Sequence, residues 1–278
     1  TADESHQARA GIRAQVNEQL GFTGGYTWKS FDDVEGGDEV GTQEHTGYDE
    51  FDFDLRADYA VTADTTLTLA PPQVAQDDAW RTHSTIYGIE WEGLKKGDDL
   101  LRSYDQNRAL TYVRLAGTDR PGLVDGYALT LSRQAQDEDM TRIRKDERRD
   151  ELGVDVTTWG ASLELESDSD LGRWVYGVDY YRDEVDSSGR HFKADGSAGK
   201  TDAQGPVADD ATYDLVGVFV QDTVPVAGDA LELTPGVRYT YAALDADKVQ
   251  DPVSGAVSSR HDDWDSVVGS LRALAPLG

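Results

Sequence analysis

A period of two in hydrophobicity is the feature that most constrains this chain. Between residues 48 and 61, apolar side chains occupy every second position and charged side chains lie between them. The apolar set is Phe51, Phe53, Leu55, Ala57, Tyr59 and Val61, and the charged set is Asp52, Asp54, Arg56 and Asp58. Successive side chains of a β-strand point to opposite faces, so this segment predicts a strand with one apolar and one charged face.

The same alternation recurs along the whole chain and predicts an all-β protein. It is clear again around Trp159, Ala161 and Leu163, and around Leu231 and Leu233. We expect eleven strands, at 6–16, 20–30, 48–61, 65–76, 107–116, 126–136, 153–167, 173–184, 213–225, 230–244 and 264–274.

The connections between these strands alternate between short and long. Short turns are expected near 17–19, 62–64, 118–125, 168–172 and 227–229, and long polar loops at 31–47, 77–106, 137–152, 185–212 and 245–263. An outer-membrane barrel has short turns on its periplasmic side and long loops outside, whereas a soluble sandwich has no reason to sort its loops by length. Many segments are also long enough to supply the roughly 9–11 residues that cross a bilayer at a tilt. We therefore expect an antiparallel transmembrane β-barrel.

Composition narrows the range of functions. The chain of 278 residues has 54 Asp and Glu against 26 Lys and Arg, which gives a formal net charge of −28. This excess of acid argues against nucleic-acid binding, which needs a basic surface. The chain has no cysteine, which excludes disulfides, thiol catalysis and thiolate metal sites. Motifs for nucleotide binding and for hydrolytic nucleophiles are missing as well, so we expect neither a cofactor nor an enzyme.

One hairpin carries a family resemblance. The segments 218–224 and 231–239, which read VFVQDTV and LELTPGVRY, resemble a mid-barrel hairpin of TonB-dependent outer-membrane receptors. The residues that match are Phe219, Gln221, Asp222, Pro235, Gly236, Arg238 and Tyr239. Segments 32–48, 76–83 and 104–108 resemble a heme-type or siderophore-type branch of the same family.

The resemblance implies a receptor built as a barrel of about 22 strands, preceded by a plug domain. The plug, the TonB box and the terminal aromatic residue of that family have no counterpart here, and the chain opens Thr1-Ala2-Asp3-Glu4 without a leader. We therefore expect residues 1–278 to be a single partial barrel domain, the N-terminal half of a receptor barrel, truncated at both ends.

The function implied by the resemblance is uptake across the bacterial outer membrane. Such a receptor imports an iron chelate (a siderophore or heme) or a similar scarce nutrient, energised by the TonB complex acting through the plug. The expected partners are thus the ferric siderophore or heme, the TonB complex, and the lipid and lipopolysaccharide of the outer membrane. No nucleic-acid partner is expected.

Pro71 and Pro72 interrupt one of the expected strands. Proline removes a backbone donor and is confined to sheet edges and bulges. In a strand that should lie inside the wall, the pair predicts a break or a bulge.

Candidate ligand-binding residues lie in the long polar loops. Trp80, Arg81, His83 and Tyr87 combine aromatic and cationic groups, which suit an anionic iron chelate or a heme. Two aspartate pairs, Asp77 with Asp78 and Asp262 with Asp263, offer hard oxygen ligands for Ca²⁺ but lack EF-hand spacing. For all of these residues a solvated loop is the alternative reading, as it is for the basic run at 142–149, whose charges we expect to pair with the acids around it.

Two further protein classes stay open on the sequence alone. A smaller complete outer-membrane barrel could carry an enzymatic, protease-like mouth built from Asp and His pairs. A soluble acidic β-protein would also fit the charge, provided that its apolar faces pack against each other.

Overall fold

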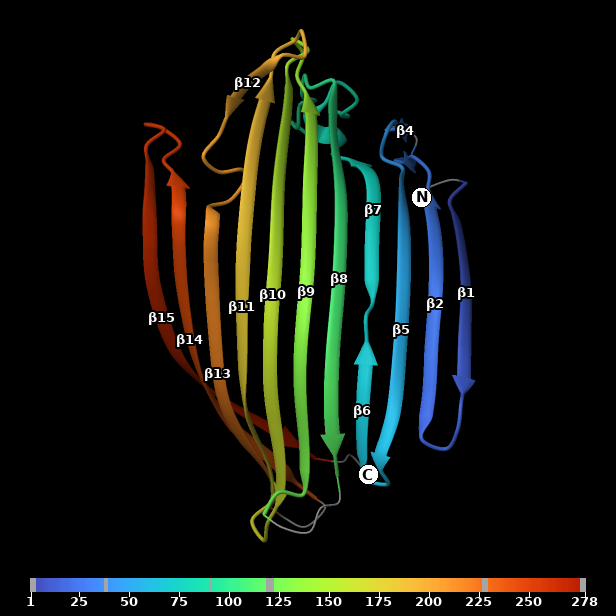
Figure 1. Cartoon of the computed structure of the whole chain (residues 1–278), viewed down its shortest axis with the longest axis vertical. Coiled ribbons are helices and arrows are strands. Elements are labelled where there is room, and N and C mark those ends of the chain that lie inside the picture. The colour runs from blue at the N-terminus through green and yellow to red at the C-terminus, as the bar shows by residue number, and fades with distance from the viewer. Residues whose placement is uncertain (1–3, 38–39, 91, 119–122, 227–229, 276–278) are drawn as a thin grey trace.

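The computed structural model describes all residues except 1–3, 38–39, 91, 119–122, 227–229 and 276–278. One antiparallel sheet contains nearly all of the chain, and its neighbouring strands follow sequence order (Figure 1). The path is β1 (His6–Gln15), β2 (Leu20–Phe31), β5 (Tyr48–Thr62), β6 (Thr65–Ala70), β8 (Leu101–Gly117), β9 (Gly126–Ile143), β10 (Arg149–Asp168), β11 (Arg173–Phe192), β13 (Asp209–Pro225), β14 (Glu232–Gln250) and β15 (Val257–Leu274). The expected eleven-stranded meander is confirmed.

Four short strands and one 3₁₀ turn, all within the described residues, lie toward the upper end of this sheet in Figure 1. They are β7 (Gln73–Trp80), β12 (Ala198–Thr201), the separate two-stranded sheet of β3 (Val34–Glu35) and β4 (Thr42–Gln43), and the 3₁₀ turn η1 (Thr82–Ser84). Short turns join the strands at the lower end, and the longer connections lie at the upper end, which we call the mouth. Among the described residues, no helix is long and apolar enough to cross a membrane.

The apolar residues at alternate positions of each strand are aligned across the sheet in rows of directly paired residues. One row takes an apolar residue from each strand between β2 and β15: Leu20, Tyr59, Leu67, Leu115, Leu129, Leu163, Val178, Val218, Tyr239 and Val267. The next row on the same face runs through Ala14, Phe22, Ala57, Leu69, Val113, Leu131, Ala161, Tyr180, Val216 and Tyr241. Leu131 is 54% exposed and Val218 is 50% exposed, and within the described residues no second sheet covers them. A packed sandwich is therefore excluded, and this face suits lipid.

The apolar face ends in a polar row nearer the mouth. This third row lies two residues along each strand from the row of Leu131 and Tyr180, on the same face. Its members are Thr111, Arg133, Trp159, Arg182 and Asp214. The guanidinium carbon of Arg133 lies 5.6 Å from the ring centre of Trp159. On β5, by contrast, apolar residues continue beyond this level to Phe53 and Phe51. The apolar band thus runs obliquely to the rows, as tilted strands in a level bilayer require.

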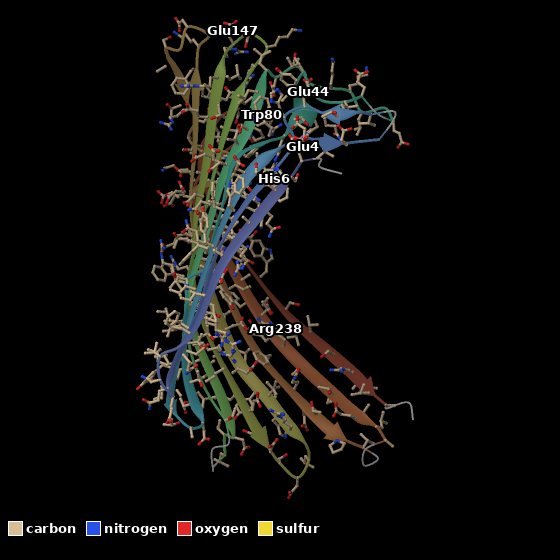
Figure 2. All side chains as sticks on the ribbon, turned by 90° about the vertical axis from the view of Figure 1, so that its right-hand side faces the viewer. Glu4, His6, Glu44, Trp80, Glu147 and Arg238 are labelled. Carbon is tan, nitrogen blue, oxygen red and sulfur yellow. The ribbon has the colours of Figure 1, made fainter. Side chains whose placement is uncertain are left out.

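The polar parity forms the other face, where two arginines bridge over glycines. Arg238 on β14 reaches across β13 to Asp179 on β11, with Nη1–Oδ1 and Nη2–Oδ2 distances of 2.9 and 2.8 Å. It passes above Gly217, where a Cβ atom would lie only 1.9 Å from Nη2 of Arg238. Contacts that span a whole strand require converging side chains, so this is the concave face of the curved wall in Figure 2.

The second bridge repeats this arrangement at the other side of the sheet. Arg9 on β1 reaches over Gly25 on β2 to Asp54 on β5, with an Nη2–Oδ1 distance of 2.7 Å. Lys29 lies nearby between Glu50 and Asp52, and its Nζ is 2.7 Å from the Asp52 carboxylate. We call this charged side the inner face, in agreement with the expectation of a hydrated lumen for Asp52 and Asp54.

The proline pair breaks one strand into two, as predicted. β6 ends at Ala70 and β7 begins at Gln73, yet both pieces lie between β5 and β8. The carbonyl of Pro72 still accepts a hydrogen bond from the amide of Leu110, at 2.9 Å. The break therefore removes donors without opening the wall.

Several strands are longer than the sequence predicted, and this corrects four of the five expected long loops. Residues 137–152 form the upper parts of β9 and β10 around a tight turn, and 185–192 extend β11. β8 likewise begins at Leu101 rather than at residue 107, and the expected loop 245–263 is shortened because β14 extends to Gln250 and β15 begins at Val257. The apolar pattern ends where the lipid-facing band ends, whereas backbone pairing continues with polar residues on both faces. The predicted boundaries were therefore those of the band, not those of the strands.

Candidate functional site

The candidate site lies at the mouth, where β7, η1 and the loop before β8 meet the turn after β4. Figure 2 places Trp80 and Glu44 at this end of the wall, the same end as Glu147. These segments are far apart along the chain, but β7 pairs with both β5 and β8 and so draws them together.

Three rings form a cluster at this point. The His45 ring stacks on Trp80 with centroids 4.3 Å apart and planes 12° apart, and the edge of Tyr87 meets His45 at 4.3 Å. Trp80 and Tyr87 themselves are 6.0 Å apart. We call His45, Trp80 and Tyr87 the ring cluster. Two of its members were predicted as ligand-binding residues, and His45 was not.

A bulge in β7 sets the direction of Trp80. The register against β8 shifts between Gln76 and Ala79, and Asp78 has a φ of +54°. The Asp78 carboxylate accepts hydrogen bonds from the Trp80 indole N–H at 2.7 Å and from the Ser103 hydroxyl at 2.6 Å. Charge-assisted bonds of this kind are stronger than neutral ones, so Asp78 fixes the indole in place.

Two polar residues hold the other members of the ring cluster. Asp33 accepts hydrogen bonds from the backbone amides of Thr46 and Gly47, at 2.8 and 2.9 Å, which fixes the turn where His45 has a φ of +64°. Thr85 is fully buried; its amide and hydroxyl both donate to the Thr82 carbonyl, and its hydroxyl accepts from the Tyr87 amide at 3.2 Å.

Arg81 lies next to the ring cluster but turns toward another ring. Its guanidinium carbon is 4.2 Å from the centre of Tyr104, a buried ring in the segment 104–108 that was not predicted as a ligand-binding residue. Arg102 also contacts Tyr104, with its Nε donating to the hydroxyl at 3.1 Å, and donates to Ser84 at 2.8 Å. The mouth thus presents cations held on aromatic rings, and Arg81 is exposed.

His83 contributes to a separate hollow beside the ring cluster. The hollow has a volume of about 560 Å³ and is lined by Gly36, Val40, Gln43, Thr82, His83, Ile89, Leu94 and Lys95. Its walls are mostly apolar, and its charged groups are Lys95 and, when protonated, His83. A cavity of ~300–1,000 Å³ with a few polar groups is typical of small-molecule sites.

A charged row on the inner face continues the mouth toward β11. Arg102, Arg142, Asp150 and His191 are directly paired in turn across β8, β9, β10 and β11. The Asp150 side chain is only 3% exposed and lies 2.5 Å from Arg142 and 2.8 Å from Arg144. Burial opposes its ionisation, but hydrogen bonds from His191, Arg142 and Arg144 outweigh burial and lower the pKa of Asp150 to about 2. The basic run therefore pairs with neighbouring acids, as expected.

The protease-like alternative finds no support in this row. The two ring nitrogens of His191 lie 2.6 Å from Asp150 and 2.5 Å from Asp202. With both nitrogens bonded to carboxylates, the imidazole has none free to accept a proton from water or a hydroxyl, as a general base must.

The four aspartates suggested for calcium lie on two strands, β7 and β15, that are not neighbours in the sheet. Asp78 is engaged by Trp80 and Ser103, while Asp262 and Asp263 are consecutive residues of β15 whose side chains point to opposite faces. In the part of the chain that the structure describes, no three His, Asp or Glu side chains lie close enough together to hold a metal ion. The calcium site stays a prediction without a ligand set.

The family hairpin lies far from the mouth, in β13 and β14. Its Arg238 forms the inner-face bridge to Asp179, and its Tyr239 lies in the outer apolar row. Asp222 is 8% exposed near the lower end of β13, and its Oδ1 atom has no hydrogen-bond partner. The remaining matched residues, Phe219, Gln221, Pro235 and Gly236, are also part of these two strands. The hairpin is a wall motif rather than a ligand site.

A single antiparallel wall with apolar outer rows, a charged inner face and its long hairpins at one end defines the class of transmembrane β-barrels. Residues 10–273 match the family described as TonB dependent receptor-like, beta-barrel. The chain therefore belongs to the TonB-dependent receptor β-barrel family, and the resemblance seen in the hairpin is confirmed. No curated protein matches the sequence.

Solved structures of transport proteins share the fold. The copper transporter OprC superposes with a TM-score of 0.74 at 17% identity, over 99% of this chain and 42% of its own. The FrpB iron transporter from Neisseria meningitidis gives 0.71 at 12% identity, over 97% and 42%. The Serratia marcescens hemophore receptor HasR, solved with its hemophore HasA and heme, gives 0.65 at 14% identity, over 97% and 41%. The chain thus spans about two fifths of the length of these proteins.

Proposed function

We propose that this chain forms wall and mouth of an outer-membrane receptor that takes up an anionic iron chelate, a siderophore or heme, or a similar scarce nutrient. The observation that carries the proposal is the mouth itself. It combines the ring cluster with Arg81 and Arg102 on Tyr104 and with the apolar hollow beside His83 and Lys95. Rings and fixed cations together bind planar, anionic chelates.

Charge supports an anionic ligand in spite of the acidic chain. The net charge is −28, yet Arg81, Arg102, Arg142 and Arg144 gather at the mouth. Local cations in a cleft raise the concentration of anions there even when the molecule as a whole is negative. The ligands of the relatives, which include copper, iron and heme, agree with a scarce nutrient but differ from one another.

The proposal includes the surroundings of the wall. The outer rows would face lipid, with lipopolysaccharide around the polar row of Arg133 and Trp159, in the bacterial outer membrane. β1 and β15 have one neighbouring strand each among the described residues. We propose that residues 1–278 form one domain whose edges pair with further strands of the receptor, and that the TonB complex energises uptake through its plug.

Binding to native outer membranes that contain the receptor tests the proposal. The probes are hemin and an iron-loaded catecholate, each measured by equilibrium binding. We expect Trp80→Ala and Arg81→Ala to weaken one of the two probes by about tenfold or more, as loss of a binding hot spot does. Trp159→Ala removes an equally large ring from the outer face and should leave binding unchanged. If Trp80→Ala and Arg81→Ala both bind each probe as tightly as the unaltered receptor does, an anionic chelate is refuted as the ligand.

A further inference from the structure

β12 and the segment that follows it lie along the edge of β11, beyond the upper end of β13 (Figure 1). We call residues 198–208 the strap. The Asp202 amide donates to the Gly189 carbonyl at 2.8 Å, and the Gly205 amide donates to the Ser187 hydroxyl at 3.1 Å. Ser187, Gly189 and His191 have the same parity as Asp179, so they belong to the inner face. The strap therefore borders the upper part of β11 at the mouth, and it reaches the inner face through the Asp202 side chain and the Gly205 amide.

The fit between strap and strand is close. A Cβ atom on Gly189 would lie 3.2 Å from the Asp202 carboxylate, and one on Gly205 would lie 2.3 Å from the Ser188 carbonyl. Ser187 and Gly189 are buried although they belong to an inner face that should be open to water. The strap covers them.

Besides these backbone contacts, His191 makes a charged contact between the strap and the wall. Its Nδ1 lies 2.6 Å from Oδ1 of Asp150 on β10, and its Nε2 lies 2.5 Å from Oδ2 of Asp202 in the strap. Carboxylates only accept hydrogen bonds, so both ring nitrogens must donate. The ring in this arrangement is therefore an imidazolium.

The two carboxylates that bind the imidazolium are also bound by other cations. From β9 and its turn, Arg142 and Arg144 share the Asp150 carboxylate with His191. From β12, Lys200 contacts the other oxygen of Asp202 at 2.7 Å. The charged residues on neighbouring elements pair among themselves, namely Arg190 with Glu151 and Lys248 with Asp209 and Asp210.

We propose that protonated His191 is a latch that holds the strap against β11, and that loss of its proton frees the Asp202 side chain and loosens the strap. A neutral ring can donate through one nitrogen only. It would then present a lone pair to one of the two carboxylates, and the strap carboxylate is the one free to move. Asp150 stays fixed by its two arginines.

The direction of the pH dependence follows from the same contacts. Hydrogen bonds to Asp150 and then to Asp202 raise the pKa of His191 above its ordinary value of 6.5. A raised pKa means that the latch is fully closed below about pH 6.5 and opens as the pH rises through the higher pKa of the folded state. Histidine is the side chain whose ordinary pKa lies nearest this range, so His191 is the group that switches.

A spin label on the strap tests the latch. Residues 1–278 contain no cysteine, so Val207→Cys, at an exposed strap position, gives a single labelling site within them. We expect the label to be immobilised at pH 6 and mobile at high pH, with a midpoint above 6.5. In the same background, Asp202→Asn should make the label mobile across the whole range, and His191→Gln should remove the pH dependence.

His261→Gln is the matched control. His261 lies on β15 with its ring 3.5 Å from Asp245, far from the strap in the sheet order, and its loss should not shift the midpoint. Gel mobility of the unheated barrel shows whether each variant has folded. A transition that persists in His191→Gln, or a strap that is equally mobile at pH 6 and pH 9, would overturn the proposal.

The role of the latch in uptake rests on the proposed function, because the strap would border the path of a ligand at the mouth. The label experiment contains no ligand, so failure of hemin or a catecholate to bind leaves its outcome unaffected. Conversely, if a chelate binds but the mobility of the strap does not depend on pH, the proposed function stands and the latch proposal is refuted.

Discussion

The wall and the mouth of this protein are built by different means. In the wall, a residue's face follows from its parity, and Leu55 and Asp54 lie on opposite sides because they are neighbours in one strand. In the mouth, the key contacts depend on departures from regular strand geometry, such as the bulge at Asp78 and the positive φ of His45. Regular pairing makes the barrier, and irregular backbone makes the site.

The wall and the mouth should also respond differently to substitutions. In the wall, each side chain faces either lipid or the inner space, so one substitution tests one environment. In the mouth, the ring cluster and the strap each depend on carboxylates that hold a partner by hydrogen bonds, so one substitution releases a neighbour. The substitutions below compare the two regions, from the largest expected effect to the smallest.

The largest effect is expected on the outer face of the wall. Leu55→Arg places a charge in the apolar band of β5 and should destabilise the receptor in a bilayer by about 2–4 kcal/mol, the cost of arginine near the membrane midplane. Its neighbour Asp54 faces inward and forms an exposed pair with Arg9, so Asp54→Asn should cost less than about 1 kcal/mol. Urea unfolding in lipid vesicles measures both. Equal losses would mean that the two faces have been assigned wrongly.

The glycine beneath the Arg238 bridge is the next test of the wall. Gly217→Ala puts a Cβ atom 1.9 Å from the Arg238 guanidinium and 2.6 Å from the Asp179 carboxylate, so the bridge must move. We expect a loss of about 1–3 kcal/mol, as for other overpacked positions.

Gly11→Ala is the control for this test. Its Cβ atom would meet the Gly24 carbonyl oxygen at 3.4 Å, an ordinary contact, so stability should hardly change. Unfolding in the same vesicles compares the two variants. If Gly217→Ala is as stable as Gly11→Ala, Arg238 has another arrangement that preserves the bridge.

In the mouth, Asp78→Ala should act on orientation more than on stability. The substitution removes the acceptor of the Trp80 indole and of the Ser103 hydroxyl, at a cost of about 1–2 kcal/mol for the hydrogen bonds. We expect broader and red-shifted fluorescence from Trp80, measured against the Trp80→Phe variant to isolate its signal. An unchanged Trp80 spectrum would show that stacking on His45 alone holds the ring.

The contrast explains how far the sequence could predict this molecule. Parity identified the strands and their faces, and Pro71 with Pro72 correctly predicted the break between β6 and β7. The strand ends above the band were missed because polar residues on both faces leave no period to follow, as in 137–143 of β9. Backbone pairing there depends on the neighbouring strand, which the local sequence does not reveal.

The candidate site was predicted in part for the same reason. Trp80, Arg81 and Tyr87 were found because aromatic and cationic residues cluster within one loop. His45 was missed because Asp33 and a left-handed turn, rather than any spacing, bring its ring onto Trp80. The contact of His191 with Asp150 and Asp202 depends on the register of β10 against β11 and on the strap, so it could not be read from either segment alone.

The smallest effect is expected at the edge of the wall, where Asp262 and Asp263 were considered for calcium. Their side chains lie on opposite faces of β15 and are exposed, so Asp262→Asn should change stability by less than about 0.5 kcal/mol. The same small value should hold with and without millimolar Ca²⁺, because neighbouring residues of a strand cannot converge on one ion. Thermal unfolding of the receptor in both conditions measures this. Stabilisation by Ca²⁺ that disappears in Asp262→Asn would mean that a second strand brings further oxygen ligands to this edge, and the edge would then resemble the mouth more than the wall.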